Sequence, residues 1–132
     1  KIIECAKAFD IVSIAYDRWN SNVLINQLSD EGIMTDPFGQ GFISMTAPIK
    51  NAEIMIKKKQ LHHGNNAMLR WMVSNVVVKK DDAENVKFSK SKAGDKIDGV
   101  VALIMAIGEQ MTIEKSDHTA SSVYEDHEIR FL

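Results

Sequence analysis

Two aspartates stand at positions in the sequence where a carboxylate can hold a metal ion. Asp17 directly follows the apolar, β-branched segment DIVSIAY (10–16), and Asp98 opens the apolar run DGVVALIMAIG (98–108). In open α/β sheets, functional groups gather at the carboxyl ends of the strands, and a helix N-terminus stabilises negative charge. Two such carboxylates can converge on Mg²⁺ or Mn²⁺, which prefer oxygen ligands. The sequence therefore offers Asp17 and Asp98 as candidate metal ligands and catalytic residues.

Each aspartate also has a purely structural explanation. An aspartate after a strand often caps a turn, and one at a helix start often supplies only a favourable terminal charge. Taken singly, the structural explanation is the stronger one for either residue. Asp95 lies three residues before Asp98, so the two share a face if both are helical. Asp95 fits a helix cap best, and we keep it as an outer candidate for the metal site.

Basic residues are concentrated in the segment that leads up to Asp98. Residues 50–96 contain eleven Lys and Arg against five Asp and Glu, a local net charge of +6. Lysines in loops can neutralise phosphates without reading sequence, although a solvated surface is the ordinary explanation of a charge run. Clusters that flank Asp98 favour a divalent cation meeting a phosphate backbone. The clusters are Lys57-Lys58-Lys59, Lys79-Lys80, and Lys87, Lys90, Lys92 and Lys96.

Helical and strand-like segments alternate along the chain and must position these residues. Apolar spacing predicts helices over 2–9, 20–32, 46–61, 66–75 and from Asp98 to about Ile113. The same spacing predicts that the following side chains face the core: Val23, Leu24, Leu28, Met68, Trp71 and Met72. Strands are predicted over 10–16, near 33–36 and from 76, with a loop or hairpin over 79–96. The 10–16 strand reads as buried on both faces. This alternation predicts a layered α/β domain with a partly parallel sheet.

Composition bounds the class of protein. The 132 residues suit one domain, and with 45% hydrophobic residues the chain can form a core without disulfides or structural metal ions. The formal net charge of −2 says nothing about partners, and the single cysteine, Cys5, excludes an internal disulfide. No apolar stretch approaches the ~20 residues of a membrane-spanning helix. Because the chain begins at Lys1 inside a helical pattern, we expect it to be part of something larger.

The order and spacing of several motifs resemble one known family. These are HGxN (His63, Gly64, Asn66), LRWM (69–72), SN followed by valines (74–78), Lys90 and KIDGVVALIMA (96–106). Upstream, IAYDRWNSNVLINQLSDEGI (14–33) and GQGFISMTAPIKNAE (39–53) fit the same pattern. Over about residues 8–110, the sequence resembles the C-terminal nuclease domain of the terminase large subunit of tailed bacteriophages or prophages.

That resemblance implies a fold and an activity. The fold is RNase H-like, an α/β arrangement with a mixed sheet flanked by helices. The activity is a Mg²⁺- or Mn²⁺-dependent endonuclease that cuts concatemeric double-stranded DNA. Two ions are expected, one activating a water and the other stabilising the leaving 3′ oxygen. Asp17 matches the second acidic ligand of the family and Asp98 the last.

The first catalytic aspartate of the family lies on a strand upstream of the helix that begins this chain. We therefore expect the N-terminal strands to be missing, and the prediction of activity applies to the complete domain rather than to this fragment alone. Missing strands would also leave an exposed sheet edge. The resulting division is a partial nuclease domain over 1–113 and an acidic C-terminal tail over 114–132.

The resemblance also implies partners and roles for further residues. Lys79, Lys80, Lys87, Lys90, Lys92 and Lys96 are the predicted DNA-binding residues. His63 and Asn66 are predicted to order a loop, and His62 and His63 lack the partners of a zinc site. The implied partners are double-stranded DNA, the terminase ATPase domain, the small terminase subunit and the portal protein, with no membrane. The implied location is the cytoplasm of an infected or lysogenic bacterium.

Two other interpretations stay open from the sequence. The segment could be a non-catalytic module that grips DNA or docks to the portal or to neighbouring subunits, since two carboxylates alone hold Mg²⁺ weakly. It could also belong to another RNase H-like enzyme such as a resolvase or integrase, although the HGxN and LRWM motifs count against that.

Overall fold

The computed structural model describes residues 1–18, 22–89 and 94–122. Over these residues it contains five helices and four short strands. The elements in chain order are α1 (Ile2–Ala8), β1 (Ile14–Tyr16), α2 (Asn22–Asp30), β2 (Thr35–Pro37), α3 (Phe42–Lys57), α4 (Ala67–Ser74), β3 (Val78–Lys80), β4 (Val86–Phe88) and α5 (Asp98–Ser122). The predicted alternation of helix and strand is therefore confirmed. None of the helices in these ranges is long and apolar enough to cross a membrane.

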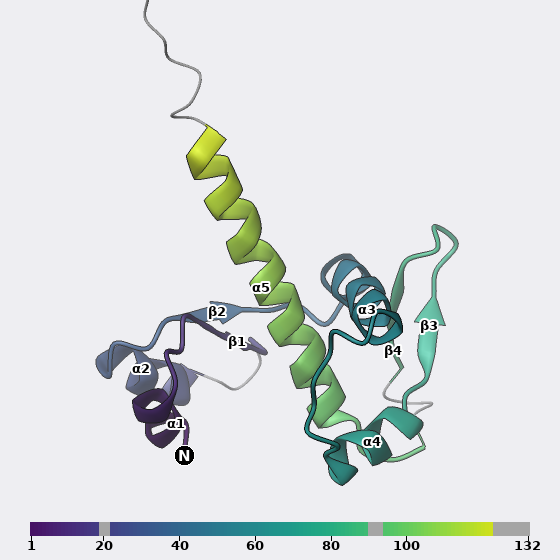
Figure 1. The fold of residues 1–132 in the computed structure, drawn as a ribbon, viewed down its shortest axis with the longest axis horizontal. Helices are drawn as coiled ribbons and strands as arrows, with labels where there is room; N and C mark the ends of the chain where they lie inside the picture. The colour runs from purple at the N-terminus through teal and green to yellow at the C-terminus, as the bar shows by residue number, and fades with distance from the viewer. Residues whose placement is uncertain (19–21, 90–93, 123–132) are drawn as a thin grey trace, which may run out of the picture.

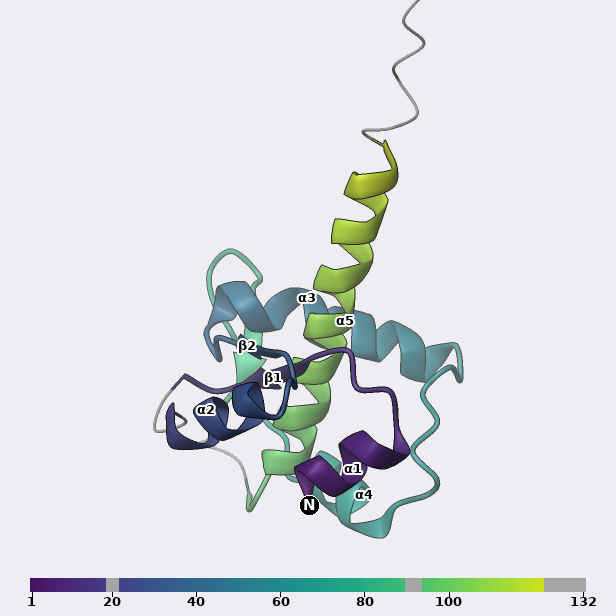
Figure 2. The ribbon, with the colours of Figure 1, turned by 90° about the vertical axis from the view of Figure 1, so that its left-hand side faces the viewer.

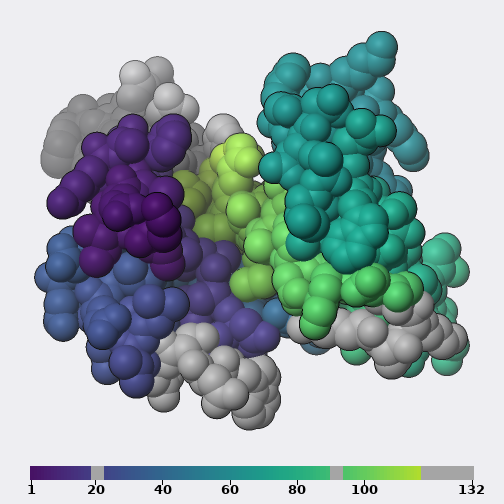
Figure 3. Space-filling model, turned by 90° about the horizontal axis from the view of Figure 1, so that it is seen from below, coloured from purple at the N-terminus to yellow at the C-terminus, as the bar shows by residue number. Residues whose placement is uncertain are grey.

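Helix α5 is the central element of the fold. In Figure 1, α1, α2, β1 and β2 lie on one side of it, and α3, α4, β3 and β4 lie on the other. Figure 2 shows α3 crossing α5. The main core forms at this crossing and extends to β4, and its buried residues are Met45, Ile49, Ala52, Val86, Val100, Ile104 and Ile107. Seen from below, α5 lies exposed between the two sides (Figure 3).

The strands form two separate sheets in the described part of the chain. β1 and β2 are parallel, with Ala15 opposite Asp36, and β3 and β4 form an antiparallel hairpin with Lys79 opposite Lys87. The expectation of one mixed sheet is thus not met in these residues. A physical reason lies at the outer edge of β4, where the Val86 N–H donates to Thr46 Oγ1 of α3 at 2.9 Å. A helix side chain occupies a donor that would otherwise bond a neighbouring strand.

Two helices differ from their predicted bounds. α3 begins at Phe42, four residues earlier than predicted, so Pro48 lies inside the helix instead of in its first turn. Pro48 is buried, and its ring packs close to Gly108 of α5. α5 continues to Ser122, beyond the predicted end near Ile113. α3 also ends at Lys57, four residues before its predicted end, so it is shifted and not lengthened. For α3, tertiary packing at its crossing with α5 outweighs local propensity.

Several apolar residues predicted to be buried are exposed. Met68 and Trp71 are 59% and 42% exposed, whereas Met72 packs on the core as predicted. In α2, Leu28 is buried, but Val23 is 75% exposed. Strand β1 is half-buried and not buried on both faces. In each case only one face of a short element meets a neighbour in the described residues, because α4 and β1 pack on α5 and α2 packs beside β2.

Candidate metal and nucleic-acid site

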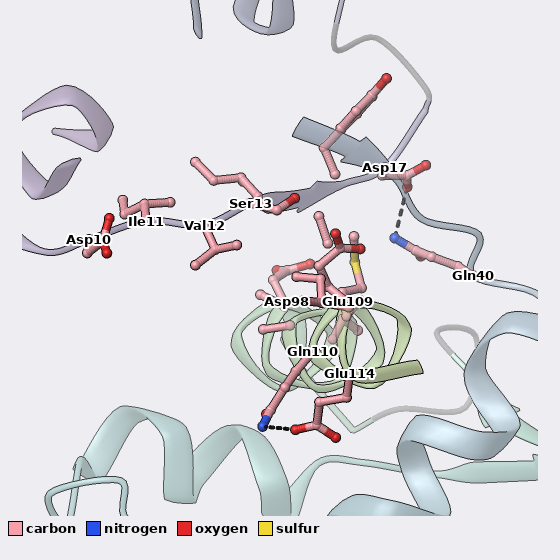
Figure 4. A pocket seen from close by; sticks show the side chains of 18 residues that line it. Asp10, Ile11, Val12, Ser13, Asp17, Gln40, Asp98, Glu109, Gln110 and Glu114 are labelled. Carbon is pink, nitrogen blue, oxygen red and sulfur yellow. Dashed lines mark hydrogen bonds between the residues drawn. The ribbon is translucent and has the colours of Figure 1, made fainter. Parts of the chain in front are cut away.

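A groove runs between β1 and α5 and contains both candidate aspartates. Its volume is about 890 Å³, and it is lined by residues 10–17, Gln40, Asp98 and one face of α5 from Val101 to Glu114. We call it the β1–α5 groove (Figure 4). Asp17 follows the last residue of β1 and is half-buried, whereas Asp98 is the first residue of α5 and is exposed. The structure therefore brings these two carboxylates, 81 positions apart in sequence, to one surface feature.

The alternation of side chains along β1 directs Asp17 toward this groove. Ala15 packs against the small buried cluster of Ile97, Val101 and Met105, so its face of the strand lies on α5. Side chains two residues apart in a strand share a face. Asp17 consequently stands on the α5 side at the carboxyl end of β1, the end at which the sequence predicted a functional group.

Gln40 holds the Asp17 carboxylate. Its side-chain amide donates from Nε2 to Asp17 Oδ2 at 2.9 Å, and Figure 4 shows the two side chains pointing toward each other. Gln40 belongs to the loop that follows β2, and the Phe38 N–H donates to the Tyr16 carbonyl at 2.8 Å to fix that loop beside β1. Sequence reasoning missed Gln40. The only signal for it was the GQG segment, in which glycines flank a single polar side chain.

Asp98 is placed by the way α5 begins. The N–H groups of Val100 and Val101 both donate to the Ile97 carbonyl, and Ile97 is buried below the helix start. The neighbouring Gly99 packs against Met72, whose sulfur accepts the Gly99 N–H at 3.2 Å. With packed residues on either side, the exposed Asp98 side chain is held at the helix mouth, where the helix dipole favours its charge.

Asp95 does not belong to this groove. Its Oδ1 accepts the Lys96 N–H at 2.8 Å, and it is not among the residues that line the β1–α5 groove. The expectation that Asp95 caps the last helix is wrong, because that hydrogen bond falls before α5 begins. In residues 1–18, 22–89 and 94–122, no group of three or more His, Cys, Asp or Glu side chains is arranged to hold a metal ion.

Comparison with known families matches this chain to one profile. The profile of the terminase large subunit, endonuclease domain, matches residues 1–114. The chain belongs to this family.

Two curated relatives and a crystal structure agree with that assignment. Protein YmfN of Escherichia coli (strain K12) is 37% identical over 139 aligned positions, which cover 99% of this chain and 30% of YmfN. The terminase large subunit of Enterobacteria phage HK97 is 36% identical over 109 positions, covering 81% of this chain and 22% of that protein. The crystal structure of the HK97 large terminase superposes with a TM-score of 0.74 at 35% identity, over 82% of this chain and 23% of the other. This terminase nuclease chain thus spans less than a third of the relatives that it matches.

Three of the six predicted DNA-binding lysines of the nuclease domain lie in the β3–β4 hairpin, on two different faces. Lys79 and Lys87 are directly opposite each other in the antiparallel register, so they share a face. Lys87 Nζ lies 4.7 Å from the centre of the Phe42 ring, in cation–π contact. Lys80 lies on the other face and bonds to Glu84 at 2.8 Å, which raises the pKa of Lys80 and lowers that of Glu84.

The remaining predicted residues occupy loops. Lys96 is exposed in the loop before α5, and its carbonyl accepts from Asn75 Nδ2 at 3.3 Å. Asn66 caps α4 by accepting the Leu69 N–H at 2.9 Å. The exposed His63 contributes its carbonyl to the Asn66 N–H at 3.1 Å. Lys90 and Lys92 lie outside the described residues.

A second pair of carboxylates, Glu109 and Asp36, lies farther along α5 from Asp98; Glu109 lines the groove, whereas Asp36 of β2 is not part of the lining. Ser13 Oγ donates to Asp36 Oδ2 at 2.8 Å, and Glu109 of α5 faces both residues. Burial raises the pKa of Glu109, and the neighbouring Asp36 carboxyl raises it further, whereas the Ser13 hydroxyl opposes the shift. Sequence reasoning missed this cluster, because its members come from three segments and match no local pattern.

Replacing Glu109 with glutamine is expected to stabilise the terminase nuclease domain at neutral pH. The pKa of Glu109 is raised above its ordinary value in the folded state, so the folded state favours the protonated carboxyl. The stability that this preference contributes is fully present below the ordinary pKa and is lost as the pH rises through the folded pKa. Glutamine keeps a neutral group at all pH values. Chemical unfolding should show Glu109→Gln to be more stable than the parent at pH 7, with a smaller difference at pH 4.

A control on the same helix separates this effect from simple charge removal. Glu114→Gln removes the same formal charge from an exposed side chain that bonds to Gln110. An equal gain at pH 7 in both variants, or a gain from Glu109→Gln that does not change with pH, would contradict the assignment to Asp36 and burial.

Proposed function

We propose that this domain is the metal-dependent nuclease of a phage DNA-packaging motor, which cuts concatemeric double-stranded DNA. Membership of the terminase endonuclease family supports the reaction class. The observation that carries the site is that Asp17 and Asp98 line one groove, from the end of a parallel strand and the start of a helix. In this proposal they are the metal ligands.

The chemistry of the groove fits a hard divalent cation. Asp17 and Asp98 offer carboxylate oxygens, the ligands that Mg²⁺ and Mn²⁺ take while keeping waters for the substrate. When bound, such ions stabilise charge on the phosphate and lower the pKa of a bound water. Gln40 bonds to one oxygen of Asp17 and so limits the orientations of that carboxylate. We propose that a further ligand comes from an aspartate upstream of Lys1.

The free flank of β1 is the place where that upstream segment would pack. Within the described residues β1 pairs only with β2, and the groove runs along β1 beside α5. Strands added at this edge would complete the larger sheet of an RNase H-like fold and bring an aspartate to Asp17. This chain matches only 23% of the HK97 large terminase, so that protein contains further chain of the kind from which such strands would come.

The DNA would be held by the basic residues of the hairpin and the loop before α5. Lys79 and Lys87 share one face, and we propose that this face, together with Lys90, Lys92 and Lys96, contacts the phosphate backbone without reading sequence. Lys80, the remaining lysine of the proposed set, would contact DNA from the opposite face of the hairpin, where it is paired with Glu84. The ATPase domain, the small terminase subunit and the portal protein are the proposed partners. The proposed place of action is the cytoplasm of the bacterial host.

Metal dependence of cutting tests this function directly. The assay uses a complete large subunit that carries this chain, because the chain spans 30% and 22% of its two relatives. Supercoiled plasmid should be nicked and linearised with Mg²⁺ or Mn²⁺ and remain intact in EDTA. DNA binding that needs no divalent ion, without any cutting at any metal concentration, would favour the non-catalytic gripping or docking role instead.

A further inference from the structure

A second hollow lies next to the β1–α5 groove and shares two residues with it. It has a volume of about 820 Å³ and is lined by Asp17, Arg18, residues 38–44 and Lys87. We call it the α3 hollow, because it lies where the loop 38–41 enters α3. Asp17 and Gln40 line both cavities, so they form the wall between them. Whatever occupies the α3 hollow therefore lies immediately beside the proposed metal ligand.

The α3 hollow carries two cationic side chains that form no ion pair with another described residue. Arg18 is exposed, and Lys87 is half-buried with its ammonium group over the Phe42 ring at 4.7 Å. The ion pairs between described residues are Lys1–Glu4 and Lys80–Glu84, so neither cation of the hollow is neutralised in this way. The one carboxylate in the lining, Asp17, already accepts a hydrogen bond from Gln40. The local charge therefore favours an anion.

Gly39, in the 38–41 loop that lines the hollow, has no side chain, so the Arg18 side chain can lie close to the backbone of that loop. A side chain on Gly39 would place its Cβ 2.7 Å from Ser44 Oγ and 3.9 Å from a guanidinium nitrogen of Arg18. The guanidinium thus lies over Gly39, on the wall formed by the 38–41 loop. A planar guanidinium presents a fork of N–H donors that matches two oxygens of one phosphate, and Lys87 adds a point charge to the same lining.

We propose that the α3 hollow binds a backbone phosphate of the DNA adjacent to the phosphate that is cut, with Arg18 as its main ligand. Arg18 would then position the duplex across Asp17. The identity of the bound anion rests on the proposed nuclease function, whereas the anion-binding character rests on the hollow alone.

Salt-dependent binding of a short DNA duplex tests this proposal in EDTA, where no cutting occurs. In a complete large subunit carrying this chain, Arg18→Ala should weaken binding about tenfold, the loss of one charge-assisted contact. It should also reduce the slope of log K against log [salt] by about 0.9, the value for one released counterion on duplex DNA. Arg18→Lys keeps the charge but not the fork, so it should restore the slope while recovering only part of the affinity.

Arg70→Ala is the matched control, because it removes the same charge from the exposed face of α4, outside the hollow. Thermal unfolding must show that all variants fold. An unchanged slope in Arg18→Ala, or an equal decrease in Arg70→Ala, would overturn the proposal. Because the assay contains no divalent metal, such a result leaves the nuclease function standing. Failure of metal-dependent cutting, in turn, does not alter the binding slope.

Discussion

Replacing Asp98 with asparagine is expected to abolish metal-dependent DNA cutting while leaving DNA binding in EDTA intact. The asparagine side chain keeps the shape of the aspartate at the mouth of α5 but removes the charge that the metal site needs. Loss of an outer-shell partner of a metal ligand typically costs ~10–100-fold in affinity or activity, and loss of the ligand itself should cost more. Plasmid cleavage with Mn²⁺, followed over time for parent and variant, measures this change.

A matched control shows whether position or charge alone matters. Asp82→Asn makes the same chemical change at an exposed position in the turn of the β3–β4 hairpin, away from the groove, and should cut normally. If Asp98→Asn cuts at the parental rate, Asp98 is not a metal ligand. The alternative explanation, a terminal charge that merely favours α5, would then be sufficient.

Replacing Gly108 with alanine is expected to lower the free energy of unfolding and to weaken cutting as well. A Cβ at this position would meet the Phe38 ring at 2.5 Å and Pro48 Cγ at 2.8 Å. Overpacking of this kind typically costs about 1–3 kcal/mol, against a gain of about 1 kcal/mol for alanine over glycine in a helix. Chemical unfolding should therefore show a net loss of up to about 2 kcal/mol.

The functional consequence follows from the neighbours of Phe38. Phe38 lies two residues before Gln40, which bonds to Asp17, so displacement of the Phe38 ring should disturb the loop that orients the carboxylate. Gly99→Ala is the comparison on the same helix, because the atom it meets is the flexible Met72 sulfur at 2.7 Å. A larger loss of stability from Gly99→Ala than from Gly108→Ala would contradict this view of the α3–α5 crossing.

Local sequence patterns were sufficient to predict the positions of the two aspartates. Asp17 follows a β-branched segment and Asp98 precedes a long apolar run, and the structure places them after β1 and at the start of α5. Each prediction depended only on where an element ends, which neighbouring residues determine. The two residues line a common groove because β1 packs against α5. Local patterns do not predict that packing, and only the family resemblance indicated that the two aspartates belong to one site.

Contacts between distant segments could not be predicted in the same way. Gln40 reaches Asp17 across 23 positions, and Glu109 meets Ser13 and Asp36 from another element. Neither contact produces a periodic pattern in the sequence. A single polar side chain in a loop or on a helix is equally compatible with simple exposure to solvent. The function of such residues becomes visible only when the fold brings their partners together.

Apolar periodicity also failed to identify which helix faces are covered. Met68, Trp71 and Val23 occur at helical spacing, yet they are exposed, while Met72 and Leu28 on the same helices are buried or packed on the core. Periodicity defines an apolar stripe but not its partner. For α2 and α4, the described residues supply a neighbour for only part of each stripe.

The central claim is that Asp17 and Asp98 are ligands of one metal site. Crystals of a complete large subunit that carries this chain, grown with Mn²⁺, test this claim most directly. An anomalous difference map locates the metal without assumptions about activity. The prediction is one or two Mn²⁺ peaks in the β1–α5 groove, with a carboxylate oxygen of Asp17 and one of Asp98 each about 2.0–2.6 Å from a peak, the range for hard cations and oxygen ligands. Mn²⁺ bound by other carboxylates, in a preparation that cuts DNA, would contradict it.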